Sequence, residues 1–418
     1  MRIIKIELIN YRGFKSKTIK FDPQFNVIMG INGIGKTSTL DALATLFSRI
    51  LPRITPYCDY RMRFSRNDIS IESDFITARA SLLFEKFSLD YSIVDEVKGK
   101  RPKSEILQSD SKKSIYIKEF DKNSLSSTKP TPIAVYYTTD RAGFRVTRKY
   151  QVPAGRAAAY QGALRDKLIN YRRFVSWLGT RRRLAEESTT DRKIFEVVET
   201  ALRTFLPNFD SISGQDDPPK LFINKNGKRL SAEQLSDGER NYVALVVDIA
   251  RHLALANPVD DNPLINGKGV VMIDELEIHL HPKWQREVVE SLHRTFPQIQ
   301  FITTTHSPFI IQSLKPGQLI DLDPDSGQDE FADRSIEDIT EFIMKIPMPQ
   351  KSQRYKAMID TAEEYYQILK QYPDVDTNEK IKLREKLDEM LLPYSDDAAF
   401  VAFLKFQRGV NLKEDATS

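Results

Sequence analysis

Apolar and polar residues alternate at the start of the chain and give way to short, continuously apolar runs further along. The alternation over residues 3–9 predicts a strand with one buried face. The apolar runs predict buried strands at 25–29, 133–137 and 269–273. Apolar side chains recur at helical spacing over residues 38–47 and 240–255, which predicts helices. Strands and helices that follow one another in this way indicate an α/β fold.

Other segments depart from this pattern. Residues 98–127 are rich in Lys, Ser and Asp, which predicts a solvated excursion. Residues 160–206 carry apolar positions at helical spacing and predict a helical hairpin, and charged helices interrupted by prolines are expected beyond residue 329. We therefore expect four parts: an N-terminal lobe (1–150), a basic helical insert (151–210), a second lobe (211–328) and a helical acidic tail (329–418).

The composition is typical of a soluble globular protein with two or three domains. The chain has 418 residues, of which 40% are hydrophobic and 29% charged. No apolar run is long enough to span a bilayer, and the N-terminus lacks the apolar core of a signal peptide. The single cysteine, Cys58, excludes intramolecular disulfides and a cysteine-based metal cluster. These features favour a cytoplasmic protein.

Charge is distributed unevenly, although the net charge is only +4. Residues 141–183 hold twelve Lys or Arg against one acid, and residues from 329 onward hold 13 basic and 19 acidic side chains. The arginines that are expected to contact a nucleic acid are Arg165, Arg172, Arg173, Arg181, Arg182 and Arg183. A solvated basic face is the alternative. The acidic tail is either a docking surface for a partner or for self-assembly, or a solvated helical cap.

A phosphate-binding motif lies between the strand at 25–29 and the helix that follows it. Residues 30–37 read GINGIGKT, which matches GxxxxGKT in the required strand, loop and helix context. The residues expected to bind ATP are Gly30, Asn32, Gly33, Gly35, Lys36, Thr37 and Ser38. Lys36 is expected to bridge the terminal phosphates, and the Thr37 hydroxyl to ligate Mg²⁺.

Two carboxylates follow the apolar run at 269–273. Asp274 is expected to hold Mg²⁺ and Glu275 to polarise the attacking water, because open α/β sheets bind ligands at the carboxyl ends of their strands. Two surface acids that cap a strand are the alternative. His306 ends a further β-rich run and is expected to contact the γ-phosphate or the water, rather than to be a structural histidine.

A second anion site is predicted where residues 235–239 read LSDGE and a helix begins. Ser236, Gly238 and Glu239, with the helix N-terminus behind them, are suited to bind phosphate, although an ordinary helix cap would read the same way. His279 and His281 lie close to the Asp274–Glu275 pair and suggest a metal site. A loop that contacts an opposite subunit is the interpretation we prefer.

These motifs, in this order, resemble the ABC-type ATPase branch that contains SMC proteins, RecF and the OLD-type ATPases. The resemblance covers roughly residues 1–145 and 220–325. Within the branch, residues 274–282 (DELEIHLHP) and 305–308 (THSP) are most similar to the bacterial anti-phage ATPases of the Septu and retron systems, such as PtuA. The resemblance implies an ABC-type (P-loop) ATPase head with a mixed β-sheet lobe, a short helical insert and a helical C-terminal tail.

The resemblance also implies how the chain works. Two copies would sandwich two ATP molecules, so that residues 30–37 of one copy face Ser236 to Glu239 of the other, and Arg12 would approach the nucleotide. The implied function is that of an ATP-hydrolysing sensor or regulatory subunit of a defence complex, which controls a separate HNH-type effector nuclease. The alternatives are a RecF-like DNA-repair ATPase that binds DNA and a nucleotide-locked scaffold.

A nuclease centre within this chain is not expected. OLD-type proteins append a Toprim nuclease, which needs an early glutamate and a later Asp-x-Asp pair. The single candidate for that pair, Asp321 with Asp323, reads more naturally as the last strand of the ATPase followed by a turn.

Overall fold

The computed structural model describes most of the chain and divides it into two units, Met1–Ile339 and Thr340–Ser418. The described residues are 1–58, 60–85, 87–96, 103–109, 130–139, 155–164, 189–206, 209–216, 219–231, 234–323, 334–346, 353–371 and 377–412. The tail predicted from residue 329 begins before the boundary between the units. The four-part division stays a prediction.

A parallel sheet forms the centre of the N-terminal unit. Its order is β13-β3-β12-β11-β7, and its strands are β3 (Phe25–Met29), β7 (Ile133–Tyr137), β11 (Gly269–Ile273), β12 (Ile299–Thr304) and β13 (Leu319–Asp321). Met272 of β11 lies opposite Ile302 on one side and Tyr136 on the other. Every residue of β3, β7, β11 and β12 is buried, as the apolar runs at 25–29, 133–137 and 269–273 predict for the first three. The pairing of β13 with β3 confirms that residues 319–321 form a strand of this sheet.

An antiparallel sheet lies on the other side of the helix that follows β3. Its order is β2-β1-β4-β5-β6, and its strands are β1 (Arg2–Tyr11), β2 (Phe14–Lys20), β4 (Phe75–Leu83), β5 (Ser88–Glu96) and β6 (Ser104–Ser109). In β1 the side chains of Ile6 and Leu8 are buried and those of Lys5, Glu7 and Ile9 are less so, in keeping with the predicted alternation.

The prediction of a solvated excursion over residues 98–127 is wrong for residues 104–109. These residues form β6, which pairs antiparallel with β5. Glu105 of this strand is partly buried and pairs with Arg49 and Arg53 of the same lobe, and composition alone cannot distinguish such a paired charge from a solvated one. The other residues of 98–127, apart from 103, lie outside the described ranges.

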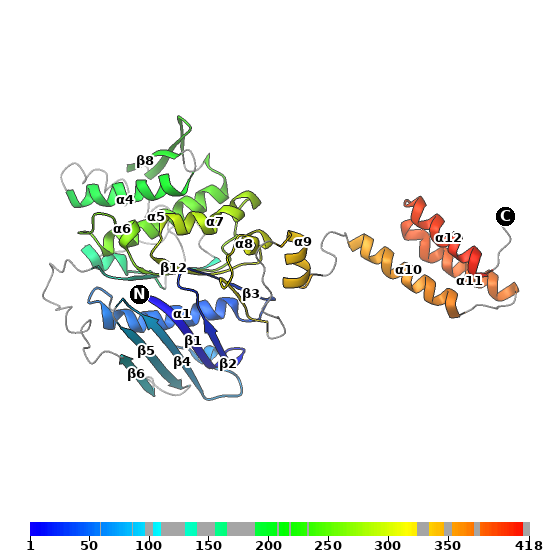
Figure 1. The fold of residues 1–418 in the computed structure, drawn as a ribbon, viewed down its shortest axis with the longest axis horizontal. Coiled ribbons are helices and arrows are strands. Elements are labelled where there is room, and N and C mark those ends of the chain that lie inside the picture. Colours follow the sequence, from blue (N-terminus) through cyan, green and yellow to red (C-terminus); the bar gives the residue numbers. More distant parts are fainter. Residues whose placement is uncertain are drawn as a thin grey trace. The chain divides into compact units, whose positions relative to one another are not determined.

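Helices separate the two sheets and cover the far face of the parallel one. Helix α1 (Lys36–Ile54) contacts β4 of the antiparallel sheet and β7 and β12 of the parallel sheet. On the opposite side lie α4 (Thr189–Phe205), α5 (Asp237–Ala256) and α7 (Pro282–Thr295), as Figure 1 shows. The parallel sheet is therefore covered on both faces, which explains why its central strands are buried throughout.

The remaining elements of the N-terminal unit are short. A three-stranded sheet consists of β8 (Phe209–Asp216), β9 (Pro219–Lys225) and β10 (Lys228–Ser231), and the antiparallel strands β9 and β10 are joined at the Asn226-Gly227 turn. The short helices are η1 (Arg66–Asp68), η3 (Gly155–Ala159), α6 (Pro263–Asn266), α8 (Pro308–Gln312), α9 (Ile336–Asp338) and η5 (Ile339–Ile343), the last of which crosses into the second unit. Of the hairpin predicted at 160–206, residues 165–188 lie outside the described ranges.

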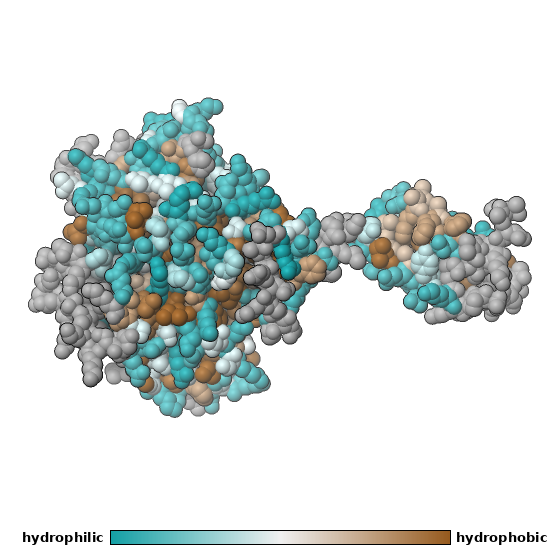
Figure 2. All heavy atoms as spheres, viewed as in Figure 1, coloured by the Kyte–Doolittle hydropathy of each residue, from teal (hydrophilic) through white to brown (hydrophobic). Residues whose placement is uncertain are grey.

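Helices α10 (Gln353–Gln371), α11 (Thr377–Leu391), η6 (Leu392–Tyr394) and α12 (Ala398–Leu412) form the C-terminal unit. Tyr365, Leu387 and Leu404 are fully buried in its small core. Phe403 and Phe406 of α12 are 54% and 67% exposed, and hydrophobic side chains gather over this helix in Figure 2. In the described part of the chain, none of the helices has the length and apolar character needed to cross a bilayer.

Candidate functional site

The glycine loop connects β3 to α1 and depends on backbone conformations that favour glycine. Gly30, Gly33 and Gly35 have φ angles of 141°, 84° and 110°, a region that L side chains rarely adopt. A Cβ built on Gly35 would lie 2.3 Å from the ring of Phe14, and one on Gly30 would lie 2.8 Å from Ile34. The loop therefore needs glycines both for its curvature and for the space around it.

Lys36 lies at the start of α1 with its ammonium group turned into the loop. Its Nζ donates hydrogen bonds to the carbonyl oxygens of Gly30 (2.7 Å) and Ile31 (3.1 Å). Burial lowers the pKa of the Lys36 ammonium, while the carboxylates of Asp274, Glu275 and Glu277 oppose that shift. The cation thus lies in the electrostatic reach of all three acids that follow β11.

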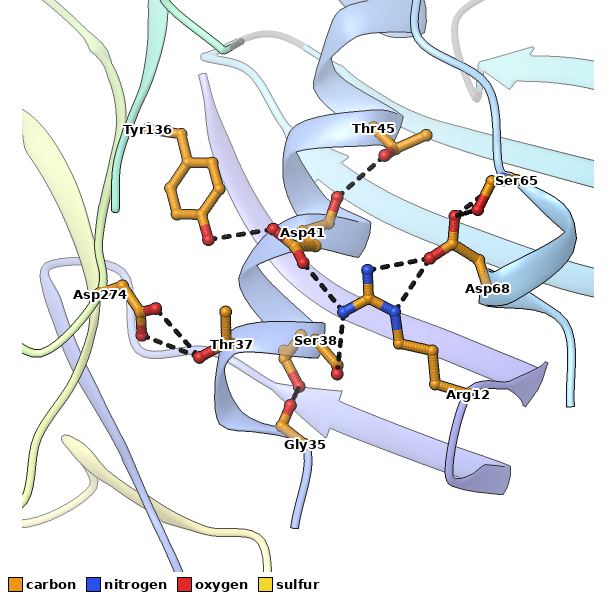
Figure 3. A network of polar contacts seen from close by, with 11 residues as sticks. Arg12, Gly35, Thr37, Ser38, Asp41, Thr45, Ser65, Asp68, Tyr136 and Asp274 are labelled. Atoms are coloured by element: carbon orange, nitrogen blue, oxygen red, sulfur yellow. Dashed lines mark hydrogen bonds and ion pairs between the residues drawn. The ribbon is translucent and has the colours of Figure 1, made fainter. Parts of the chain in front are cut away.

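Thr37 and Asp274 meet although 237 positions separate them in the sequence. The Thr37 hydroxyl donates to both carboxylate oxygens of Asp274, at 3.0 and 3.3 Å (Figure 3). Asp274 is 3% exposed, and its backbone N–H donates to the carbonyl of Tyr137 on the neighbouring strand. A hydroxyl, a carboxylate and a nearby ammonium form a donor set that suits a Mg²⁺–nucleotide complex.

An all-protein metal cage does not occur in the described part of the chain, where no group of three His, Cys, Asp or Glu side chains is placed to hold an ion. Mg²⁺ bound with a nucleotide does not require one, because it retains phosphate and water ligands beside one or two protein groups. His281 caps the N-terminus of α7, since its Nδ1 accepts the Lys283 N–H at 3.3 Å. His279 is exposed and has a φ angle of 62°.

Glu275 and His306 are held through their backbones. Glu275 has a φ angle of 46°, and its N–H donates to the hydroxyl of Thr304 at 2.7 Å. The N–H of His306 donates to a carboxylate oxygen of Glu277 at 2.5 Å. The backbones of the two residues expected to act on water are therefore held where the chain leaves the neighbouring carboxyl ends of β11 and β12.

Arg12 contacts the residue that follows the GKT triplet. Its guanidinium donates to the Ser38 hydroxyl at 3.1 Å and to Asp41 at 2.9 Å, and it pairs with Asp68 at 2.9 Å (Figure 3). The hydroxyl of Tyr136 donates to the other oxygen of Asp41 at 3.1 Å. Arg12 is thus brought to the first turn of α1.

The predicted second anion site lies at the N-terminus of α5. The Ser236 hydroxyl accepts the N–H of Glu239 and forms a capping box with it. Glu239 pairs with Lys225 at 3.0 Å. Burial raises the pKa of Glu239, but Lys225 and Ser236 outweigh burial and keep that pKa below its ordinary value. A Cβ on Gly238 would lie 2.3 Å from the carbonyl oxygen of His279, so this glycine permits a close approach of the first turn of α5 to the backbone of His279.

The structure brings together most of the residues predicted from the sequence. Lys36, Thr37, Asp274 and Glu275 lie in one site, and Arg12 lies at the helix turn that continues it. Asn32 and Gly33 are exposed at the tip of the loop. The roles assigned to all these residues remain predictions. The arginines expected to contact nucleic acid, from Arg165 to Arg183, lie outside the described residues.

Sequence reasoning missed several residues that hold the site together. Asp41 and Tyr136 organise Arg12, while Thr304 and Glu277 anchor the acids and the histidine. Asp41 has a weak sequence signal, because four residues after Thr37 it falls on the same face of α1. The contacts of the other three span between 29 and 95 positions, and no local pattern encodes them.

Comparison with known proteins agrees with this geometry. The sequence profile of the family described as "AAA domain, putative AbiEii toxin, Type IV TA system" matches residues 25–312. The chain is 27% identical to the "Retron Ec83 probable ATPase" of Escherichia coli over 391 residues, which covers 75% of this chain and 70% of that protein. It is 28% identical to the "Retron Vc95 probable ATPase" of Vibrio cholerae serotype O1 biovar El Tor, covering 76% and 73%.

A third relative aligns along nearly the whole chain. The "Septu protein PtuA" of Bacillus thuringiensis is 22% identical over 425 aligned positions, which cover 94% of this chain and 95% of the relative. The resemblance to retron and Septu ATPases that residues 274–282 and 305–308 indicated is thereby confirmed, and so is the α/β ATPase head that it implied.

Proposed function

The chain belongs to the AAA domain family that is described with putative AbiEii toxins of type IV toxin–antitoxin systems, and from this premise we propose that it binds and hydrolyses ATP as a regulatory subunit of an anti-phage defence complex. The observation that supports the proposal most is the contact between Thr37 and Asp274 beside the Lys36 ammonium. This contact places the Lys36 ammonium beside the Thr37 hydroxyl and the Asp274 carboxylate, the charge and the two oxygen donors that binding of a Mg²⁺–nucleotide requires. The retron and Septu relatives support the role in defence.

Each residue then has a defined task. The N–H groups of the glycine loop and the Lys36 ammonium bind phosphate oxygens, and the N-terminus of α1 adds its partial positive charge. Thr37 and Asp274 would hold Mg²⁺, which supplies positive charge to the phosphates when it is bound. Glu275 orients and polarises the attacking water. His306 contacts the terminal phosphate or that water.

The proposal includes a dimer of two copies around ATP. Ser236 is exposed at the N-terminus of α5, where the partial charge of a 20-residue helix favours an anion. Gly238 lies against the backbone of His279, in the loop that follows Glu275. We infer that these residues of one copy complete the phosphate site of the other. Such an arrangement makes hydrolysis depend on dimerisation.

The proposed output is the control of a separate effector, an HNH-type nuclease. We infer this from the likeness to retron and Septu ATPases. Under this proposal, ATP turnover in the head changes how the effector is held or released. The partner would be a distinct protein that copurifies with the full chain.

The test is the substitution Glu275→Gln in the purified full-length chain. We expect steady-state ATP hydrolysis to fall by about 10²–10⁴-fold, the range for loss of a general base. ATP binding should persist, and ATP-bound dimers should accumulate in light scattering coupled to size exclusion. Glu290→Gln, an exposed acid on α7, is the matched control. Undiminished turnover in Glu275→Gln would overturn the assignment.

A second measurement addresses the biological role. Expression of tagged Glu275→Gln in its native host, followed by identification of copurified proteins, should recover a nuclease together with the ATPase. Turnover that DNA stimulates without any protein partner is the contrary result, and it would favour a role in DNA repair.

A further inference from the structure

Thr304, the last residue of β12, is bonded to both acids at the end of β11. Its side chain is fully buried. Its hydroxyl donates to Asp274 at 2.6 Å and accepts the N–H of Glu275 at 2.7 Å, and its carbonyl accepts the N–H of Leu276 at 2.9 Å. One threonine therefore fixes the carboxylate of Asp274 and two consecutive N–H groups of the segment that carries Glu275.

Glu277, in the segment that follows β11, binds the turn that follows β12. One of its carboxylate oxygens accepts the Thr305 hydroxyl at 2.7 Å, and the other accepts the N–H of His306 at 2.5 Å. The Thr305 hydroxyl also accepts the N–H of Ser307 at 3.0 Å. The turn that carries His306 is thus held by a side chain from the segment that carries Glu275.

We propose that Thr304 and Glu277 are positioning residues of the ATPase site, which together hold Glu275 and His306 as one rigid unit. We call Thr304 and Glu277 together the reciprocal latch. Neither residue needs to touch the nucleotide. The inference rests on the proposed ATP hydrolysis and adds the elements that set the spacing between the two side chains acting on water.

The backbone conformation of Glu275 needs contacts that stabilise it. A φ angle of 46° is unfavourable for a residue with a side chain and persists when surrounding contacts determine it. Hydrogen bonds to the hydroxyl and carbonyl of Thr304 provide those contacts on consecutive N–H groups. Without them, the peptide is free to relax to a negative φ, which would turn the Glu275 side chain away from its position.

The first experiment compares Thr304→Val with Thr303→Val in the full-length chain. Valine keeps the shape of threonine and removes the hydroxyl. Thr303 is equally buried on the same strand, but its hydroxyl donates only to the backbone of Asn26, at 3.3 Å. We expect kcat to fall about 10–100-fold in Thr304→Val, the usual effect of removing a partner that orients a metal ligand. Thr303→Val should stay close to wild type.

Equilibrium binding provides a readout that does not depend on turnover. With a non-hydrolysable ATP analogue, the Mg²⁺ concentration that gives half-maximal binding should rise in Thr304→Val, because Asp274 loses the donor that orients it. Affinity for the analogue without Mg²⁺ should not change. Thr304→Ser, which keeps the hydroxyl, should restore both Mg²⁺ affinity and turnover. Thermal unfolding of each variant separates these effects from loss of the fold.

The second experiment tests Glu277 by a double-mutant cycle with His306. If Glu277 acts through His306, the double variant Glu277→Ala/His306→Ala should turn over no more slowly than His306→Ala alone. Additive losses would overturn this half of the latch. Glu290→Ala serves as the control for removal of an acid from the same region of sequence.

The outcomes distinguish the latch from the function on which it rests. Absence of hydrolysis in the wild-type chain, or full activity of Glu275→Gln, defeats the ATPase assignment itself. Hydrolysis that depends on Glu275 but is equal in Thr304→Val and Thr303→Val leaves the ATPase intact and overturns the latch. The latch is also overturned if Thr304→Val loses turnover but its Mg²⁺ affinity does not change. Failure of Thr304→Ser to keep wild-type turnover overturns it as well.

Discussion

Glu105 joins the C-terminal half of α1 to the edge of the antiparallel sheet. Its carboxylate pairs with Arg49 and Arg53 of the helix, at 2.8 Å in each case, and accepts the Tyr91 hydroxyl at 2.6 Å. Arg49 is buried and also donates to the carbonyl of Met62. Glu105→Gln removes the countercharge of both arginines while it keeps the size of the side chain.

The magnitude follows from the titration of this carboxyl group. Burial raises the pKa of Glu105, but the hydrogen bonds from Arg49 and Tyr91 and the positive charges of Arg49 and Arg53 lower it from 4.5 to about 2. At 1.36 kcal/mol for each pH unit, the difference between the two values corresponds to about 3 kcal/mol; because the carboxyl group is partly exposed and solvent screens its ion pairs, the ionised form contributes about 1–2 kcal/mol to stability at neutral pH. We expect Glu105→Gln to lose a free energy of unfolding of about this size.

The pH dependence has a definite sign. Because the pKa is lower in the folded state, the unfolded chain binds more protons, and the contribution is complete above pH 4.5. It is lost as the pH falls from 4.5 towards 2. The difference in stability between wild type and Glu105→Gln should therefore shrink over this range, since both side chains are then neutral.

Urea unfolding followed by tryptophan fluorescence measures this difference. Trp284 of α7 packs against Tyr242 in the N-terminal unit, so its fluorescence reports on the unfolding of that unit. The control is Glu96→Gln, whose partner Lys103 forms an exposed pair with it; surface pairs contribute about 0–1 kcal/mol. If Glu105→Gln were no less stable than Glu96→Gln at pH 7, the reasoning would be refuted. A difference that stays constant down to acid pH would refute it equally.

Two further substitutions test other parts of the N-terminal unit. Gly35→Ala forces a residue with a side chain to a φ of 110° and its methyl group against Phe14, so we expect affinity for a fluorescent ATP analogue to fall about tenfold or more; binding equal to wild type would contradict the role of the loop. Asp248→Asn removes a carboxylate that accepts the Tyr137 hydroxyl and pairs with Arg251. We expect that change to cost about 2 kcal/mol in urea unfolding, and an unchanged midpoint would show that the network contributes little.

The nucleotide loop and the strands around it were accessible from the sequence because their signals are local. The glycines at 30, 33 and 35 provide the positive φ angles that the turn needs, and this requirement lies within the loop itself. The strands at 25–29 and 269–273 are buried on both faces and read as apolar runs. Asp274 could be placed at a strand end for the same reason.

Longer-range pairings escaped the sequence reasoning. Glu105 lies in a stretch rich in Lys, Ser and Asp, and its partnership with Arg49 across 56 positions turns an apparently solvated segment into strand β6. Thr304 is one of three consecutive threonines, and nothing in that run distinguishes the one that bonds to Asp274 and Glu275. Pleating decides it, because neighbouring side chains on a strand point to opposite faces.

The sequence by itself therefore determined the class of the fold, the nucleotide loop and the candidate acids, because each depends on residue types within a few positions of one another. The tertiary structure alone decided that Thr37 meets Asp274, that Asp41 and Asp68 hold Arg12, and that Thr304 orients the acids. Hydrogen bonds of this kind act over about 3 Å between groups that the chain brings together from distant positions. Their partners are specified by the topology of the sheet and not by any local pattern.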